Sequence, residues 1–244
     1  MRGGKLICWL FPVFAGLPAT ASADAAELVL YLEQQIDFSS AAGMQQKNIH
    51  RLWYDGRRLR VEIEGGKHRS VLLMDGVGQE IKLLFPAIRS WARYPLEDYR
   101  KSLGARFGRL IAGEITLEEK EEEENIGKWR CRRFVLRAPS ASGLSSELCV
   151  GEVAEVPAGL YAELMERLGL DRVFGGLYQK VQALGKVPVR VKSTVSGQGE
   201  EMRVEQKLLL AEKRPAPEKL FSVPEDYLEI TDLPLPEAQT GGQK

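Results

Sequence analysis

The sequence contains few cysteines and histidines, and it has no excess of charge of either sign. Its 244 residues include three cysteines and two histidines, and 34 basic residues balance 34 acidic ones. This balance argues against a nucleic-acid partner, which requires a strongly basic face. The sequence has no G-x-S-x-G, H-E-x-x-H, P-loop or G-x-G-x-x-G motif. We therefore expect no enzymatic activity, no cofactor and no metal site.

Long apolar runs are also absent. A membrane-spanning helix requires roughly 20 apolar residues, whereas the apolar stretch at 6–17 is short and is broken by Pro12 and Gly16. Basic residues precede this stretch, and Ala-Ser-Ala follows it at 21–23, which is the pattern of a secretory signal peptide. We expect residues 1–23 to be removed by cleavage after Ala23 and the protein to be periplasmic. Retention of the segment as an amino-terminal anchor is the alternative.

Only two cysteines remain once Cys8 leaves with the signal peptide. Cys131 and Cys149 form an even pair, and in an oxidising compartment such a pair predicts a disulfide. If the two flanking strands pair with Cys131 opposite Cys149, then Arg133 lies opposite Glu147, a favourable pairing. A redox pair or half of a metal site are the alternatives, but C-x-x-C spacing and a four-ligand zinc pattern are both missing.

Alternation of apolar and polar residues dominates the rest of the chain and predicts strands. The strongest local signal is Asp55-Gly56, a two-residue hairpin turn between two alternating runs. A Glu-rich run at 114–122 is expected at a sheet edge, where charges discourage unwanted pairing. The ten strands that we expect cover residues 27–38, 45–54, 57–64, 70–74, 79–85, 114–122, 128–136, 146–153, 187–195 and 201–210.

Helical periodicity appears in a few segments only. Residues 95–103 suggest a short helix, and two apolar stripes at 160–168 and 173–184 form a helical insertion at about 157–185. Residues 216–230 suggest a final turn and a short strand laid against the sheet. We predict one domain over residues 24–232 and a disordered tail at 233–244. Its fold class is mainly β with helices (α+β), a curved antiparallel sheet or half-barrel with helices on the concave face.

His50 and His68 are the only groups that titrate near neutral pH without a perturbing environment. The Asp55-Gly56 turn places His50 opposite Val61, on the apolar side of its strand. Two interpretations of His50 stay open: a group in a cavity, or a partly buried strand histidine with a local partner. His68 lies in a Gly-Gly-Lys-His-Arg turn and is expected to be exposed. The same register puts Trp53 opposite Arg58, where a cation-π contact is expected.

The order of several short motifs resembles an uncharacterised family of secreted bacterial proteins, a domain of unknown function with the lipoprotein-carrier-like (Lol-type) fold. That fold is a curved antiparallel half-barrel with helices plugging its concave side. The resemblance implies an apolar concavity able to hold acyl chains, and an envelope location. The motifs that carry it are WYDGRRLRVE at 53–62, RSWARYPLEDY at 89–99, GKWRCRRFVL at 127–136, ELCV at 147–150, VPVRVKS at 187–193 and LFSVPEDY at 220–227.

These features lead to a binding hypothesis. The protein is expected to hold an acyl chain, a lipid or a lipoprotein in an apolar concavity, with a lipid, a lipidated protein or an outer-membrane or envelope protein as partner. The alternative is a protein-interaction or scaffold module whose core is filled by its own helices. Trp91 either packs in the core or lines the rim. The candidate ligand-binding residues are Leu28, Leu30, Leu32, Leu59, Val61, Ile63, Trp91, Phe174 and Leu177.

Overall fold

The structure is a computed structural model that describes residues 28–66, 68–76, 79–107, 115–137, 144–173, 175–197 and 200–231. The predicted signal peptide, the predicted C-terminal tail and Phe174 lie outside the described residues.

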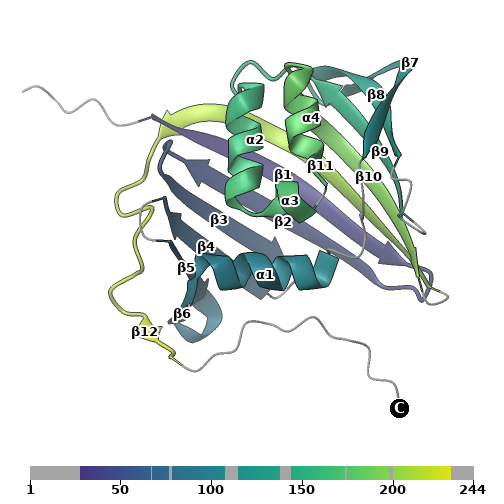
Figure 1. Ribbon diagram of the computed structural model, residues 1–244. Helices are drawn as coiled ribbons and strands as arrows, with labels where there is room; N and C mark the ends of the chain where they lie inside the picture. The colour runs from purple at the N-terminus through teal and green to yellow at the C-terminus, as the bar shows by residue number, and fades with distance from the viewer. Residues whose placement is uncertain are drawn as a thin grey trace, which may run out of the picture.

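The described residues form a single open, curved sheet of twelve strands (Figure 1), which confirms the predicted fold class. The strand order is β12-β6-β5-β4-β3-β2-β1-β11-β10-β9-β8-β7, and every pairing is antiparallel except that of β12 with β6. The Glu-rich strand β7 lies at one edge, as expected. The strands are β1 (Leu28–Ser40), β2 (Gln45–Tyr54), β3 (Arg58–Gly65), β4 (His68–Asp75), β5 (Glu80–Phe85), β6 (Ser90–Pro95), β7 (Thr116–Ile126), β8 (Trp129–Arg137), β9 (Leu144–Gly151), β10 (Val187–Gly197), β11 (Glu200–Pro215) and β12 (Leu228–Glu229).

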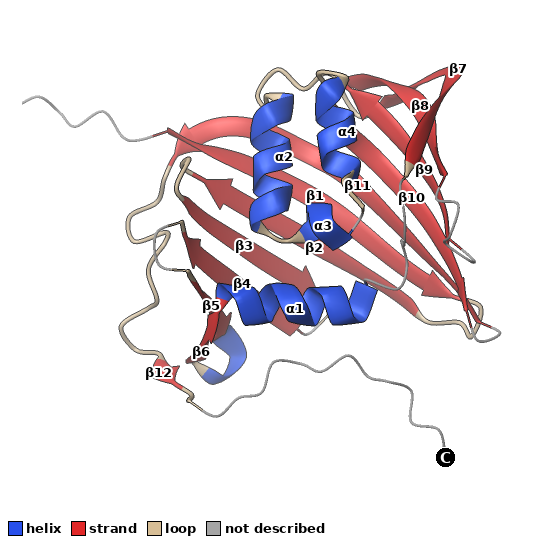
Figure 2. Cartoon of the chain, in the orientation of Figure 1, coloured by secondary structure: helices blue, strands red, loops and turns tan. Residues whose placement is uncertain are grey.

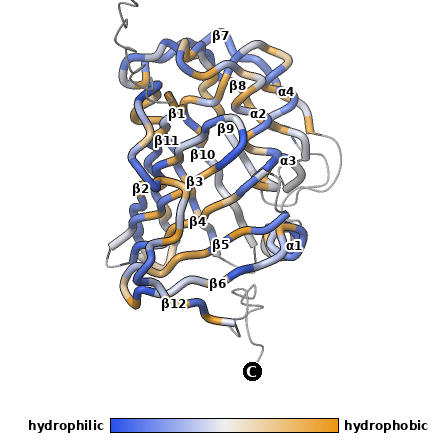
Figure 3. Tube along the Cα trace, turned by 90° about the vertical axis from the view of Figure 1, so that its left-hand side faces the viewer, coloured by the Kyte–Doolittle hydropathy of each residue, from blue (hydrophilic) through white to orange (hydrophobic). Residues whose placement is uncertain are grey.

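The helices all lie on one side of the sheet (Figures 2 and 3). Within the described ranges they are α1 (Leu96–Phe107), α2 (Ala158–Arg167), α3 (Leu170–Val173) and α4 (Leu177–Ala183), with a 3₁₀ turn at Pro86–Ile88. The prediction of one continuous helix over 173–184 is wrong. Gly175 and Gly176 have φ values of 59° and 76°, a left-handed conformation that ends a right-handed helix. The Asp171 carboxylate then accepts hydrogen bonds from the first turn of α4.

The two faces of the sheet bury different sets of residues. We call the face that contacts the helices the inner face. On it, strand residues such as Leu32, Leu59 and Ile81 join α2 residues such as Leu164 in one large apolar core. The opposite, outer face is covered over part of its area by residues 216–230. There Leu220 and Phe221 pack against Val29, Tyr31 and Trp53, and Val223 and Tyr227 pack against Val71, Leu73, Leu84 and Trp91.

Two hairpin registers differ from the sequence prediction by two residues. The Asp55 carboxylate accepts hydrogen bonds from the backbone N–H groups of Arg57 and Arg58, at 2.8 and 2.5 Å. This side-chain turn centres the hairpin on Gly56-Arg57, so His50 lies opposite Ile63 instead of Val61. Because a shift of two residues preserves the alternation, every side chain keeps its predicted face.

The predicted disulfide between Cys131 and Cys149 is confirmed, with a Cα–Cα distance of 5.3 Å. In the observed register, however, Cys131 lies opposite Gly151 and Cys149 lies opposite Arg133, so the bridge runs diagonally between the strands. The expected interaction between Arg133 and Glu147 is present as an ion pair at 2.6 Å. A structural disulfide fits a protein that is exported to an oxidising compartment.

Candidate functional site

Helix α2 seals one half of the inner face. Its buried residues Tyr161, Leu164 and Met165 pack on the apolar inner side chains of β1 to β5. In the middle of α2 the Glu163 carboxylate accepts a hydrogen bond from the Tyr54 hydroxyl at 2.9 Å. Burial, followed by this hydrogen bond, raises the pKa of Tyr54 to about 12. These contacts fix α2 onto the β2–β3 hairpin, so this half of the inner face is part of the protein's own core.

The inner face continues beyond the helix-covered core. There we define the open inner patch, a group of half-buried side chains on neighbouring strands. The register places Phe38 of β1 opposite Val204 of β11, and Ile63 of β3 between His50 of β2 and Ser70 of β4. Ile36 lies between Phe38 and the buried Gln34 on β1. The open inner patch consists of Ile36, Phe38, His50, Ile63, Ser70 and Val204.

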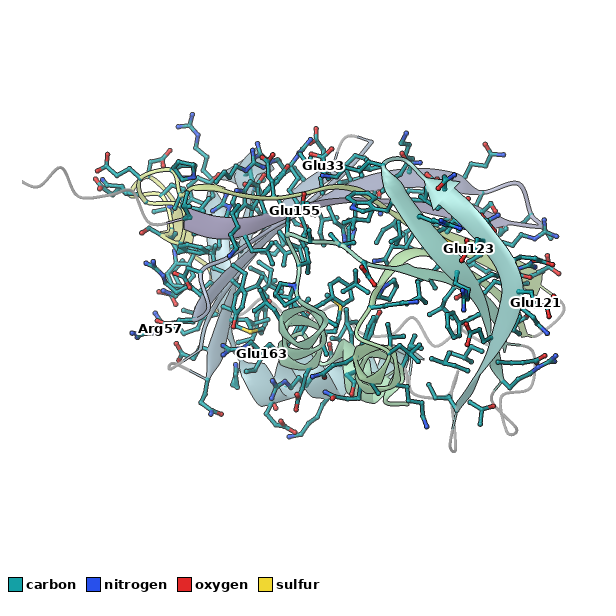
Figure 4. All side chains as sticks on the ribbon, turned by 90° about the horizontal axis from the view of Figure 1, so that it is seen from above. Glu33, Arg57, Glu121, Glu123, Glu155 and Glu163 are labelled. Carbon is teal, nitrogen blue, oxygen red and sulfur yellow. A yellow bond between two sulfur atoms is a disulfide. The ribbon has the colours of Figure 1, made fainter. Side chains whose placement is uncertain are left out.

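In the described strands β1 to β6, all Lys, Arg, Asp and Glu side chains lie on the outer face. No inner-facing position there carries Lys, Arg, Asp or Glu. The charged side chains point outward and form ion pairs, such as Arg51 with Glu33 at 3.2 Å and Arg60 with Glu62 at 2.7 Å. In Figure 4 the labelled Glu33 lies at the sheet, away from the two helices seen end-on. The inner face is therefore an uncharged surface over six strands.

His50 supplies the titratable group of the open inner patch. Burial lowers the pKa of His50 from 6.5 to about 4, so the imidazole is neutral at pH 7. Among the residues that the structure describes, it has no hydrogen-bond or ion-pair partner. The structure thus confirms the inner-facing position that the sequence predicted, and it does not provide the local partner that one interpretation of His50 requires.

Acidification is expected to destabilise the folded protein through His50. Between pH 6.5 and about 4 the unfolded state holds a proton on this residue and the folded state does not. The free energy of unfolding should therefore fall as the pH falls through this window. Thermal denaturation from pH 7.5 to 4.5 should show a smaller pH dependence for His50→Gln than for wild type. His68→Gln, at an exposed histidine, is the matched control, and an equal effect of both variants would contradict the assignment.

Several other polar groups on the inner face are paired. Gln34 lies under α2 and its amide donates to the Tyr161 hydroxyl at 3.5 Å. Asn48 accepts from Gln46 at 3.0 Å, and the hydroxyls of Ser146 and Ser193 are 2.8 Å apart. Burial raises the pKa of Tyr161 to about 12, so its hydroxyl stays neutral. All these groups are uncharged hydrogen-bonding groups.

The candidate residues from the sequence fall into several places. Four of them lie on the inner face but are buried in the core under the helices, namely Leu30, Leu32, Leu59 and Val61. Ile63 lies at the border of that core. Leu177 is buried in a second inner cluster with residues of β8 and β9. Leu28, at the start of β1, is 59% exposed.

Two tryptophan predictions need correction. Trp91 packs against the apolar cluster of Val71, Leu73 and Leu84, as one of its two interpretations predicted, but it does so on the outer face, between Lys82 and Arg93, and the rim interpretation is wrong. Its strand β6 was not predicted, so its face was unknown. Trp53 packs against Tyr31 at a ring-centroid distance of 5.0 Å. Arg58 instead lies over the ring of Phe221, at 4.6 Å.

Within the described ranges, no group of three or more His, Cys, Asp or Glu side chains is placed to hold a metal ion. None of the described helices is long and apolar enough to cross a membrane. A surface recess of about 440 Å³ lies at the ends of β1, β9, β10 and β11. Its lining mixes acidic residues such as Asp37 and Glu205 with basic residues such as Lys192 and Arg203, which distinguishes it from the uncharged inner face.

No sequence family matches the chain, and no curated protein matches it. Among solved structures, an uncharacterised conserved protein from Thermus thermophilus gives a TM-score of 0.46 at 10% identity, over 84% of this chain and 91% of that chain. A LolA superfamily protein from Nitrosomonas europaea gives 0.33 at 11% identity, over 80% and 90%. A DUF1329 family protein from Desulfovibrio piger gives 0.32 at 10% identity, over 82% and 91%.

Because every one of these TM-scores is below 0.5, the proposals that follow depend on the residues and geometry of this chain alone.

Proposed function

We propose that the protein is an exported envelope protein that binds an acyl chain, of a lipid or a lipidated protein, against the open inner patch. One observation carries the proposal: apolar residues of the inner face remain half-buried where the helix-covered core ends. Ile36, Phe38 and Val204 lie on adjacent strands and belong to none of the apolar clusters of the described residues. Around them the inner face of β1 to β6 is free of charge.

Burial of apolar surface supplies the driving force for such binding. Each CH₂ group of a ligand that leaves water contributes about 0.8 kcal/mol. The strands that carry the patch are held by antiparallel hydrogen-bonded ladders, with one register shift between β1 and β11 at Glu33/Gln34, so little ordering of the backbone is required on binding. The disulfide and the predicted signal peptide support an envelope location, where acyl chains are abundant.

Two adjacent positions with opposite faces provide a matched test. Phe38 points inward and Ser39 points outward on β1, and both are half-buried. Phe38→Asp and Ser39→Asp therefore introduce the same charge one residue apart. We expect wild type and Ser39→Asp to carry bound lipid in native mass spectrometry, and Phe38→Asp to bind at least about tenfold more weakly, because a buried carboxylate repels an acyl chain.

Thermal denaturation of both variants must accompany the binding measurement. If both remain folded and retain equal amounts of lipid, the open inner patch is not the binding surface. If only Phe38→Asp loses lipid while its melting temperature stays close to that of Ser39→Asp, the loss is a property of the site.

The alternative function is a protein-interaction or scaffold module of the envelope. The dense packing of α2 on the inner face, with Leu164 fully buried, favours it because much of the concavity is filled by the protein's own helix. Native mass spectra of wild type that show only the bare mass, together with no binding of added acyl compounds, would favour this alternative.

A further inference from the structure

The open inner patch contains two polar groups besides its apolar residues. His50 and Ser70 lie on either side of Ile63, on β2 and β4, in one cross-strand row. Both are half-buried, and neither has a hydrogen-bond partner among the residues that the structure describes. Neither is among the described side chains whose polar atoms are buried without a partner, so both groups remain accessible to water in the free protein. An occupant that covers them must supply a partner, because burying polar groups without partners is costly. The row therefore presents an unpaired imidazole and an unpaired hydroxyl to whatever occupies the patch.

Both groups are neutral donors at pH 7. A neutral imidazole carries one N–H, and a serine hydroxyl donates one hydrogen bond. Their natural counterpart is an acceptor without charge, such as an ester carbonyl. A carboxylate or phosphate placed here would find no cation to pair with on these strands, since the inner face of the described strands β1 to β6 has no Lys or Arg. The nearest basic side chains of these strands, such as Arg51 and Arg69, point outward and are paired with Glu64 and Glu62.

We propose that the occupant of the open inner patch is an uncharged acyl ester whose carbonyl accepts a hydrogen bond from His50, while Ser70, two strands away, donates to the second ester oxygen. This inference rests on the proposed function, since it names the chemical class of the acyl compound that is bound. The alkyl chain lies on Ile36, Phe38 and Val204, and the ester linkage lies at the His50–Ser70 row. Free fatty acids and acyl phosphates are selected against because their charge would be buried without a partner.

Three compounds of the same alkyl length distinguish the contribution of the carbonyl group to binding from the contribution of charge. Methyl dodecanoate has a neutral carbonyl, dodecanoate has a charged carboxylate, and dodecyl methyl ether has neither carbonyl nor charge. Each is titrated at pH 7.5 against the protein loaded with 1-aminoanthracene, a neutral fluorescent apolar probe. We expect methyl dodecanoate to displace the probe at a concentration at least about tenfold lower than dodecanoate. The ether should be about fivefold weaker than the ester, through the loss of the hydrogen bonds.

Substitutions of His50 and Ser70 test whether these two residues cause the preference for the ester. In His50→Leu the difference between ester and ether should disappear, whereas His68→Leu, at an exposed position on the end of β4, should keep it. Ser70→Ala, a smaller change at the other end of the row, should reduce the difference and provides a second variant if His50→Leu does not fold. A difference between ester and ether that is unchanged in both row variants would overturn the assignment of these residues.

The wild-type titrations also distinguish this inference from the proposed function. Equal displacement by all three compounds, or tighter binding of dodecanoate, would overturn the ester preference and leave acyl-chain binding in place. No displacement by any of them, with no binding of the probe, would overturn both.

Discussion

Loss of the Cys131–Cys149 disulfide is expected to lower the free energy of unfolding by about 3 kcal/mol. The bridge closes a loop with a sequence separation of 18 residues, and the chain-entropy model assigns about 3 kcal/mol to a loop of this size. Both cysteines are buried, at 2% and 0% exposure. Cys131→Ala/Cys149→Ala should therefore unfold at a lower urea concentration than the oxidised wild type, measured by circular dichroism.

The control for this experiment is the wild-type protein under reducing conditions. Reduced wild type and the double alanine variant should have similar midpoints, because both lack the cross-link. A difference below about 1 kcal/mol between oxidised and reduced wild type would contradict a structural role for the bridge, and would restore the redox interpretation of the pair.

Leu164→Ala is expected to destabilise the protein by about 2 to 5 kcal/mol, the range for a leucine removed from a packed core. Leu164 has no exposed surface and lies where α2 meets the inner face. The cavity would lie between helix and sheet, so α2 should also lose protection against amide hydrogen exchange before β1 does. Chemical denaturation combined with hydrogen exchange measures both effects.

Leu184→Ala is the matched control for this variant. Leu184 directly follows α4 and is 42% exposed, so its truncation should cost little. If Leu164→Ala were no more destabilising than Leu184→Ala, α2 would not be an integral part of the core, and the division of the inner face into a sealed half and an open half would fail.

Most of the strands could be predicted because the alternation of apolar and polar residues along a strand does not depend on the conformation of the turns that connect the strands. β2 (Gln45–Tyr54) has the predicted bounds, and several others differ by one or two residues at each end. β6 could not be predicted from alternation, because one of its inner positions is the polar Ser90 and one of its outer positions is the apolar Trp91. The helix break at Gly175–Gly176 could not be predicted from periodicity, because the apolar stripe continues across these two left-handed glycines.

The register of the β2–β3 hairpin shows what a turn motif leaves undecided. Asp55-Gly56 predicts a hairpin, but the Asp55 side chain accepts two backbone N–H groups and moves the centre of the turn by one residue. Sequence alternation fixed the face of each residue correctly, including His50. It gave no information on which part of that face the helices cover.

Because alternation does not show which part of the inner face the helices cover, the sequence predicted the correct face for the candidate residues but not their exposure. Leu30 and Val61 are on the predicted face but under the helices, whereas the half-buried Ile36 and Phe38, which continue the same alternation along β1, were not selected. The useful signal was present in the sequence: β1 is long, and its inner positions remain apolar past Gln34. Only the placement of α2 shows that this far end lies beyond the helix-covered core.

The location of a bound acyl chain tests the account most directly. The methyl ester of 16-doxylstearate, a neutral acyl ester with a nitroxide on its chain, broadens nearby methyl signals in nuclear magnetic resonance spectra of the methyl-labelled protein. We predict strong broadening of the methyl groups of Ile36, Ile63 and Val204 on the inner face, and weaker broadening of those of Leu73 and Leu210 on the outer face. Broadening confined to the outer face, or no broadening at saturating ester, would contradict the account.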